Sequence, residues 1–191
     1  MIQRRTRKCI MVDKKRNVED WVRLAKEIGF SHAGPLDPKT LKTENWVRET
    51  CSSDKCHAYG HNWTCPPACG TLEECGGQME QYEYGILLQT VGILSRSIDY
   101  KAYMKTEEEH KVCFLKFIEK IKSVYPEALC LGAGGCRICV HCAYPGPCRF
   151  PRKACSSMEA YGLFVTQVCR DNHMDYYYGP QTITYTACVL F

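Results

Sequence analysis

Two segments of the chain repeat apolar residues every three or four positions, which is the spacing of an amphipathic helix. The first segment is 18–29 and the second is 106–125. The apolar positions are Val18, Trp21, Val22, Leu24 and Ala25 in the first, and Phe114, Phe117, Ile118, Ile121 and Tyr125 in the second. We expect Gly29 to end the first helix and Thr106 to cap the second. The sequence TLEE, which has the form of a capping box, predicts a third helix from Thr71 to Tyr82.

Four other segments have the apolar runs or the alternation that is typical of strands. They are residues 30–36, 84–94, 128–135 and 182–191. The run 84–94 suits a buried strand, and 128–135 ends in a glycine turn that leads into a cysteine-rich loop. A short helix is expected at SMEAYG. Helices between apolar strands predict an α/β fold: one compact domain, a mixed sheet flanked by helices, and cysteine-rich cluster-binding loops at strand ends.

The chain has no convincing linker, so we expect a single α/β metal-binding domain over residues 18–191 after a basic N-terminal arm over 1–17. The formal net charge is +4, and the basic residues are scattered apart from RRTRK in the arm. We therefore expect a solvated arm and no nucleic acid partner. No apolar stretch is long enough to cross a bilayer, which argues against a membrane partner.

Cysteine use is the most unusual feature of the composition, with 15 in 191 residues. The chain opens with MIQRRTRK, and its first apolar run stops at Asp13, which does not fit a signal peptide. A cytoplasmic protein is therefore expected. Reducing conditions there disfavour disulfides, and so does an odd number of cysteines. Thiolate ligands of a metal are the better interpretation.

The densest group of thiols is CRICVHCAYPGPC, residues 136–148, with spacing C-x2-C-x2-C-x5-C. Thiols at i, i+3 and i+6 allow one tight loop to bind three corners of a four-iron cluster, so Cys136, Cys139 and Cys142 are the predicted ligands. Cys148 is the fourth ligand by proximity, although the last cysteine of such a run in bacterial ferredoxins binds the other cluster. Structural zinc sites usually have two separated C-x2-C pairs, so this segment favours [4Fe-4S] over zinc.

A second group of five thiols lies upstream, in residues 51–75. Its spacings match no regular ferredoxin or zinc-finger pattern, but the density exceeds that of ordinary packing. The predicted ligands of a second cluster are Cys51, Cys56 and Cys65, with Cys75 ahead of Cys69 as the fourth. His57 or His61 could replace one thiol, although loop histidines more often face solvent or pack.

The other thiols and the carboxylates are weaker candidates for a functional site. Cys113, Cys130 and Cys188 lie among apolar residues and are expected to be buried structural thiols, whereas Cys9, Cys155 and Cys169 have no assigned role. No acid–base pair stands out. Glu159 is the best single carboxylate near the cysteine loop, and a helix-surface position is the expected one. The sequence contains no phosphate-binding loop, no G-x-G-x-x-G motif and no nucleophile elbow, so nothing supports a nucleotide-binding protein or a hydrolase.

Together, the motifs LGAGGCRICVHC, PCRFP and SSMEAYGLFV, with C-x4-C-x2-YG-x4-CPP at 51–67, resemble the DUF2284 family of predicted metal-binding proteins from anaerobic archaea and bacteria. The resemblance runs from about residue 18 to the end and implies an iron–sulfur or other metal-binding protein, without a defined reaction. The family's metal-binding residues would fall on Cys51, Cys56, Cys65, Cys136, Cys139, Cys142 and Cys148. Many relatives have RPSMEA where this chain has KACSSMEA, so Cys155 is an extra thiol.

Three functions remain open. The leading hypothesis is a cytoplasmic redox protein with two [4Fe-4S] clusters that passes electrons to or from a partner enzyme. The second is a cluster-dependent reductase of a small substrate, suggested by the surplus of thiols and by the aromatic run at 176–178. The third is a structural zinc-binding interaction module, because zinc and iron share thiolate ligands.

Overall fold

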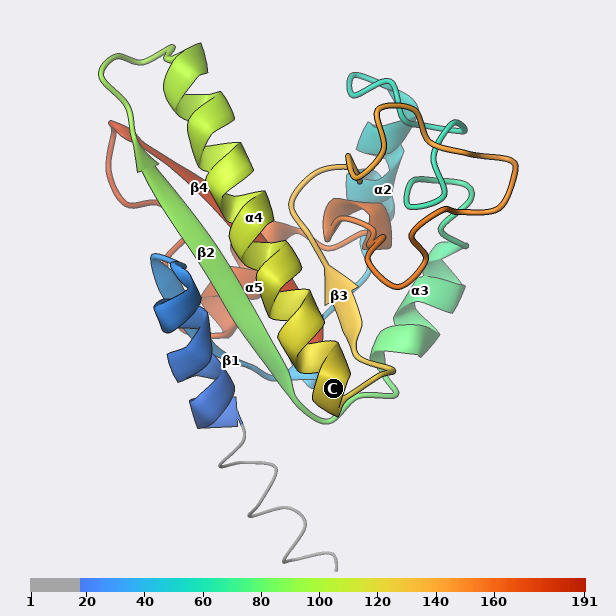
Figure 1. The fold of residues 1–191 in the computed structure, drawn as a ribbon, viewed down its shortest axis with the longest axis horizontal. Coiled ribbons are helices and arrows are strands. Elements are labelled where there is room, and N and C mark those ends of the chain that lie inside the picture. Colours follow the sequence, from blue (N-terminus) through green and yellow to red (C-terminus); the bar gives the residue numbers. More distant parts are fainter. Residues whose placement is uncertain (1–17) are drawn as a thin grey trace, which may run out of the picture.

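A four-stranded sheet forms the centre of the molecule (Figure 1). The computed structural model describes residues 18–191, so the basic arm and Cys9 lie outside the described residues. The strands are β1 (His32–Leu36), β2 (Gly85–Ile93), β3 (Leu129–Leu131) and β4 (Thr182–Leu190), in the order β1-β2-β4-β3. All four expected strands are confirmed, with β3 shorter than its apolar run.

The α/β fold is confirmed, but the sheet is antiparallel throughout instead of mixed. Because β2 and β3 both pair antiparallel with β4, they run in the same direction and are joined by the helix α4 (Tyr100–Val124). This is the helix-between-strands pattern that suggested parallel pairing. The last strand, β4, inserts between β2 and β3, so the two strands that share a direction are not neighbours.

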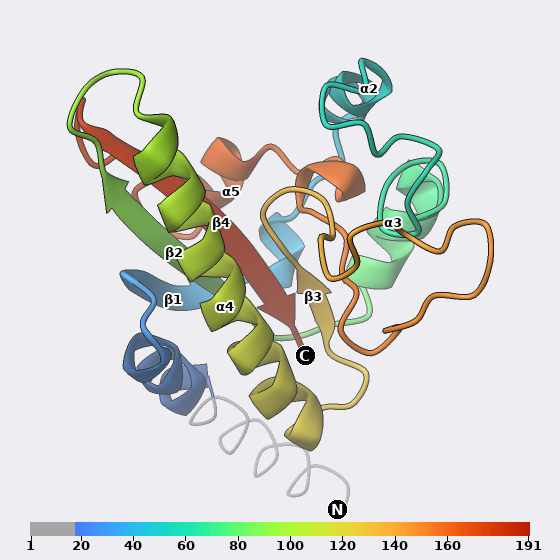
Figure 2. The same ribbon diagram turned by 45° about the horizontal axis from the view of Figure 1, so that its top comes forward.

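Both faces of the sheet are covered, which explains why β2 is apolar at successive positions. Ile86 and Leu88 pack on one face with Phe117 of α4 and Trp21 of the helix over residues 18–28. Leu87, which points to the opposite face, belongs to a second cluster that includes residues from α5 (Val165–Asp171), α3 (Leu72–Met79) and the 3-10 turn η2 (Glu159–Tyr161). Figure 2 shows α4 lying along the first face.

Of the two helix caps predicted from the sequence, the structure confirms one. Thr71 caps α3 in a complete capping box with Glu74, as expected. The expected cap at Thr106 is wrong, because α4 begins at Tyr100 and Asp99 accepts from the Ala102 N–H at 3.0 Å. Thr106 instead lies in the second turn of α4, where its side chain is buried and its Oγ1 donates to the carbonyl of Ala102. The first turns of α4 are mostly exposed, so they lack the apolar repeat that revealed the rest.

A second part of the molecule lies beside the β3 edge of the sheet (Figure 1). It contains α2 (Asn45–Ser52), which the sequence did not predict, together with α3, η2 and the two cysteine-rich loops. We call residues 44–80 and 132–162 the thiol region, and the rest of the described chain the sheet region. Over residues 18–191, no helix combines the length and apolar character needed to cross a membrane.

Candidate metal centres

The downstream cysteines lie on a loop whose two ends meet beside β3. The Gly132 N–H donates to the Ser156 carbonyl at 2.8 Å, and the Met158 N–H donates to the Gly132 carbonyl at 3.0 Å. The intervening chain has no helix or strand among its residues 133–155. It is a long irregular loop, closed at its base by backbone hydrogen bonds and rich in glycines, prolines and cysteines.

Four thiols of this loop line one small pocket of about 20 Å³. They belong to Cys136, Cys139, Cys142 and Cys148. All four predicted downstream ligands are therefore brought together. Among residues 18–191, however, no group of three or more Cys, His, Asp or Glu side chains is arranged to hold a metal ion as it stands. The thiols share a pocket, and their role as ligands stays a prediction.

Two side chains of the upstream cysteine segment, residues 51–75, form hydrogen bonds with the downstream loop. Asn62 donates through Nδ2 to the Cys136 carbonyl at 3.2 Å, and Trp63 donates through Nε1 to the Gly146 carbonyl at 2.8 Å. Within the downstream loop, Arg149 donates to the His141 carbonyl at 2.9 Å. These side chains bind backbone carbonyls, and no periodic pattern in the sequence marks such contacts. They hold the two loops together as one unit.

The downstream thiols also influence one another electrostatically. Burial raises the pKa of Cys136, and the neighbouring thiols of Cys142, Cys148 and Cys139 raise it further. A backbone N–H at Ile138 acts in the opposite direction. Thiolates this close repel one another, so their joint deprotonation requires a nearby positive charge. A soft cation supplies that charge, which makes the donor set suitable for a thiolate-bound metal.

The thiols of the upstream trio, Cys51, Cys56 and Cys65, interact electrostatically, and their role as ligands stays a prediction. Burial raises the pKa of Cys65 to about 11, with further contributions from Cys56, Cys51 and Cys136. The two groups adjoin, because a Cβ placed on Gly135 would lie 3.8 Å from Cys65 Sγ.

The backbone around Cys56 is unusual. Two residues that are not glycine adopt left-handed conformations on either side of it, Asp54 at φ 48° and His57 at φ 53°. Such conformations cost free energy and persist where the surrounding structure fixes them, which is common at functional sites. His57 and His61 themselves are exposed, as expected for loop histidines.

Cys75 and Cys69 form a separate pair beside Arg48. Cys75, 1% exposed, has its thiol 3.6 Å from the Cys69 carbonyl and 3.8 Å from Nη1 of Arg48. A hydrogen bond from the Cys69 thiol lowers the pKa of Cys75 to about 7, and the Arg48 guanidinium acts in the same direction. These contacts give Cys75 partners of its own, and its assignment as fourth upstream ligand stays a prediction.

Glu159 differs from expectation. It was expected on a helix surface, but it lies in η2 and its Oε2 is buried without a hydrogen-bond partner. Burial raises the pKa of this carboxyl group. The position follows from tertiary packing, because η2 lies against both α2 and α3. In the sequence, the one sign of this burial is that Glu159 has small and apolar neighbours in SMEAYG.

The other thiols have mostly structural surroundings. Cys130 and Cys188 are buried as expected, whereas Cys113 is half-buried. Cys169 is buried against the Nε2 amide of Gln89. Cys155, the extra thiol, has its pKa raised to about 12 by burial, with smaller contributions from Cys130 and Cys136.

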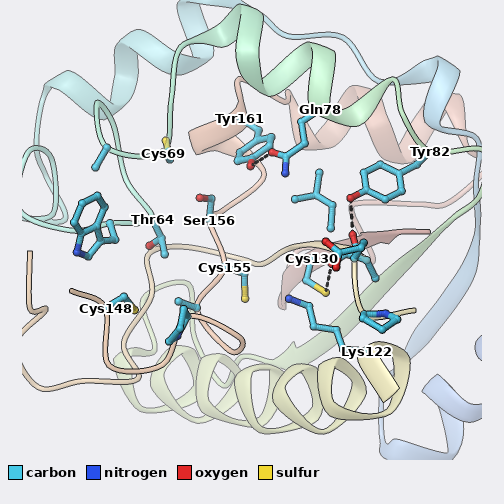
Figure 3. Close-up of a pocket in the computed structure, with 18 residues that line it drawn as sticks. Thr64, Cys69, Gln78, Tyr82, Lys122, Cys130, Cys148, Cys155, Ser156 and Tyr161 are labelled. Carbon is cyan, nitrogen blue, oxygen red and sulfur yellow. Dashed lines mark hydrogen bonds between the residues drawn. The ribbon is translucent and has the colours of Figure 1, made fainter. Parts of the chain in front are cut away.

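A larger pocket of about 450 Å³ opens next to the downstream thiols (Figure 3). Cys148 lines both this pocket and the small one. The larger pocket lies between α3 and the C-terminal end of α4. Its labelled lining residues include Cys69, Gln78, Tyr82, Lys122, Cys130, Cys155, Ser156 and Tyr161. Tyr161 donates to Gln78 at 2.7 Å, and Lys122 donates to the Arg152 carbonyl at 3.3 Å.

Comparison with known proteins identifies a family for the chain. Neither the curated proteins nor the solved structures gave a match. One family did: its profile, described as predicted metal-binding protein (DUF2284), matches residues 34–191, which include both thiol groups, Glu159 and the sheet except for the first two residues of β1. A match over most of the chain establishes membership. The chain belongs to the DUF2284 family of predicted metal-binding proteins.

Proposed function

We propose that this protein is a cytoplasmic iron–sulfur protein with two [4Fe-4S] clusters, which exchanges electrons with a partner enzyme. The observation that carries the proposal is the gathering of Cys136, Cys139, Cys142 and Cys148 around one small pocket. Three of them have the spacing that ferredoxins use to bind a cluster. The second cluster belongs to Cys51, Cys56 and Cys65.

The proximity of the two thiol groups supports electron transfer. Cys65 of the upstream trio lies beside Gly135, next to the first downstream ligand. When bound, an iron–sulfur cluster supplies reversible one-electron chemistry. The thiols lie on two loops that hydrogen bonds from Asn62 and Trp63 join to each other. Two adjoining centres on such a rigid support suit electron exchange between them.

An apolar surface beside the downstream thiols suits a partner protein. Val140, between two predicted ligands, is 95% exposed, and Phe150 is 45% exposed. Exposed apolar side chains that form a contiguous patch mark protein–protein interaction sites. A redox partner that covers them would approach the downstream centre closely.

A redox titration of protein purified and kept under strict anaerobic conditions tests the proposal. We expect absorption at roughly 400 nm that bleaches on reduction and returns on reoxidation. Cys113→Ser, a thiol outside both groups, is the matched control and leaves the titration unchanged. A protein that holds zinc and shows no redox change would instead be the structural zinc module.

A cluster-dependent reductase is the second candidate, and the pocket of about 450 Å³ favours it. Pockets of roughly 300–1,000 Å³ are typical of small-molecule sites. Because Cys148 lines both pockets, a molecule in the larger one would lie next to the downstream centre. A small molecule that changes the paramagnetic spectrum of the reduced protein, but not that of Lys122→Ala, would support this candidate. An unchanged spectrum across candidate substrates would favour plain electron transfer.

A further inference from the structure

The buried oxygen of Glu159 requires a physical explanation. Oε2 has no hydrogen-bond partner and is sealed from solvent. Burying a polar oxygen without a partner costs free energy, and a carboxylate costs more than a neutral group. Unsatisfied buried groups in native proteins often mark an ion or a functional role. The carboxyl group of Glu159 has hydrogen bonds from its own backbone N–H and from Ser157, so Oε2 is the one oxygen that lacks a partner, and a bound cation would supply it.

Tight packing fixes η2 in the cleft between α2 and α3. Arg48 of α2 donates through Nη1 to the Ala160 carbonyl at 2.5 Å, and the Glu44 N–H donates to the Gly162 carbonyl at 2.8 Å. Gly162 has φ 75°, and a Cβ there would overlap Leu72 of α3. Since contacts from two helices hold the turn, Glu159 cannot shift far from its place beside α2.

Cys51 lies on the part of α2 that faces this turn. It follows Arg48 by three residues, so the two side chains share one side of the helix. Cys51 and Glu159 interact electrostatically, and Cys51 also interacts with Cys56. Glu159 also interacts with Tyr176 and Cys188. It is thus a buried carboxylate in electrostatic contact with Cys51, the member of the upstream trio that lies on α2.

We propose that Glu159 is the fourth ligand of the upstream metal centre and binds through Oε2, beside the thiolates of Cys51, Cys56 and Cys65. This rests on the proposed function, which places a centre at the trio. The assignment gives the orphaned oxygen a partner and leaves Cys75 with Cys69 and Arg48. A carboxylate is a harder ligand than a thiolate. The upstream centre would therefore differ from the downstream one in both potential and ease of ligand exchange.

Glu159→Gln tests the assignment in the full chain after anaerobic reconstitution with ferrous iron and sulfide. We expect the affinity of the upstream centre for iron to fall at least tenfold, with the paramagnetic signal of the downstream centre unchanged. Glu73→Gln, an exposed glutamate of α3, is the matched control and keeps both centres. Cys75→Ala also keeps both, because Cys75 is not a ligand in this arrangement.

Glu159→Cys covers the case in which Glu159→Gln folds poorly. A thiolate at this position can still bind metal, so we expect the upstream centre to return with a shifted paramagnetic spectrum. An upstream centre that is unchanged in Glu159→Gln, or lost in Cys75→Ala but not in Glu159→Gln, would overturn the assignment alone. Wild-type protein with no iron at the trio would overturn the proposed function for that centre as well.

Discussion

The sheet region and the thiol region are held together in different ways. In the sheet region, β2 and β4 pair over nine residues each, and Phe117 of α4, 0% exposed, packs in a cluster of apolar side chains. The downstream loop of the thiol region is held by side chains that bind backbone carbonyls, as Asn62, Trp63 and Arg149 do. Apolar packing and strand pairing thus hold the sheet region, whereas hydrogen bonds to backbone carbonyls hold the downstream loop.

Removing core volume should have the largest effect on stability. Phe117→Ala leaves a cavity under the sheet, and we expect it to lower the free energy of unfolding by about 3–5 kcal/mol. Urea denaturation followed by circular dichroism measures this. A loss below about 1 kcal/mol would mean that the sheet region is not the main source of stability.

Lowering the pH should reduce the stability of the sheet region through the buried side chain of His110. Burial lowers the pKa of His110 to about 4, and its ring lies 3.0 Å from the Thr90 hydroxyl. Between pH 6.5 and 4 the unfolded chain takes up a proton that the folded protein refuses, so stability falls as the pH falls. The full loss is about 3 kcal/mol at the acid end of this range.

His110→Gln separates this histidine from the other titrating groups. Glutamine can still bond to Thr90 but carries no proton in this range. We expect the unfolding free energy of the variant to depend less steeply on pH than that of the wild type over the same interval. Parallel curves for the two proteins would exclude His110 as the cause.

A smaller effect is expected at Thr71, which caps α3 in the thiol region. Thr71→Ala removes the side-chain acceptor for the Glu74 N–H and should cost about 1 kcal/mol. Thr71→Ser keeps the hydroxyl and serves as control. Equal losses in the two variants would show that the hydroxyl does not contribute through the cap.

The smallest effect on the sheet region is expected from Cys139→Ser in the downstream loop. Its thiol lines the small pocket and lies outside both apolar clusters. Urea unfolding of the sheet region should change by less than about 0.5 kcal/mol, while the downstream centre is lost. A cooperative loss of both regions would mean that the metal centre stabilises the whole molecule.

The sequence predicts the elements of the sheet region better than the contacts of the thiol region. Apolar periodicity predicted the helix at 18–28, most of α4 and all four strands, because burial against a sheet imposes a regular spacing. It did not reveal β4 between β2 and β3, since strand order depends on long-range packing. It also missed α2 and α5, which are only eight and seven residues long.

In the thiol region, spacing alone identified the four downstream cysteines that share a pocket. It could not reveal the burial of Glu159, because that depends on where η2 packs between two helices. Nor could it find the clamp by Asn62 and Trp63, whose partners are carbonyls more than 70 positions away. Local patterns predict which residues carry chemistry, and tertiary packing decides which of them meet.

The proposed function depends above all on a metal cluster held by Cys136, Cys139, Cys142 and Cys148. Iron and acid-labile sulfide per chain, measured on anaerobically purified wild type and on a variant with these four cysteines changed to serine, test it most directly. We expect the wild type to contain about four more iron and four more sulfide per chain than the variant, with the sheet region folded in both. Equal iron and sulfide in the two proteins, or none in either, would contradict it.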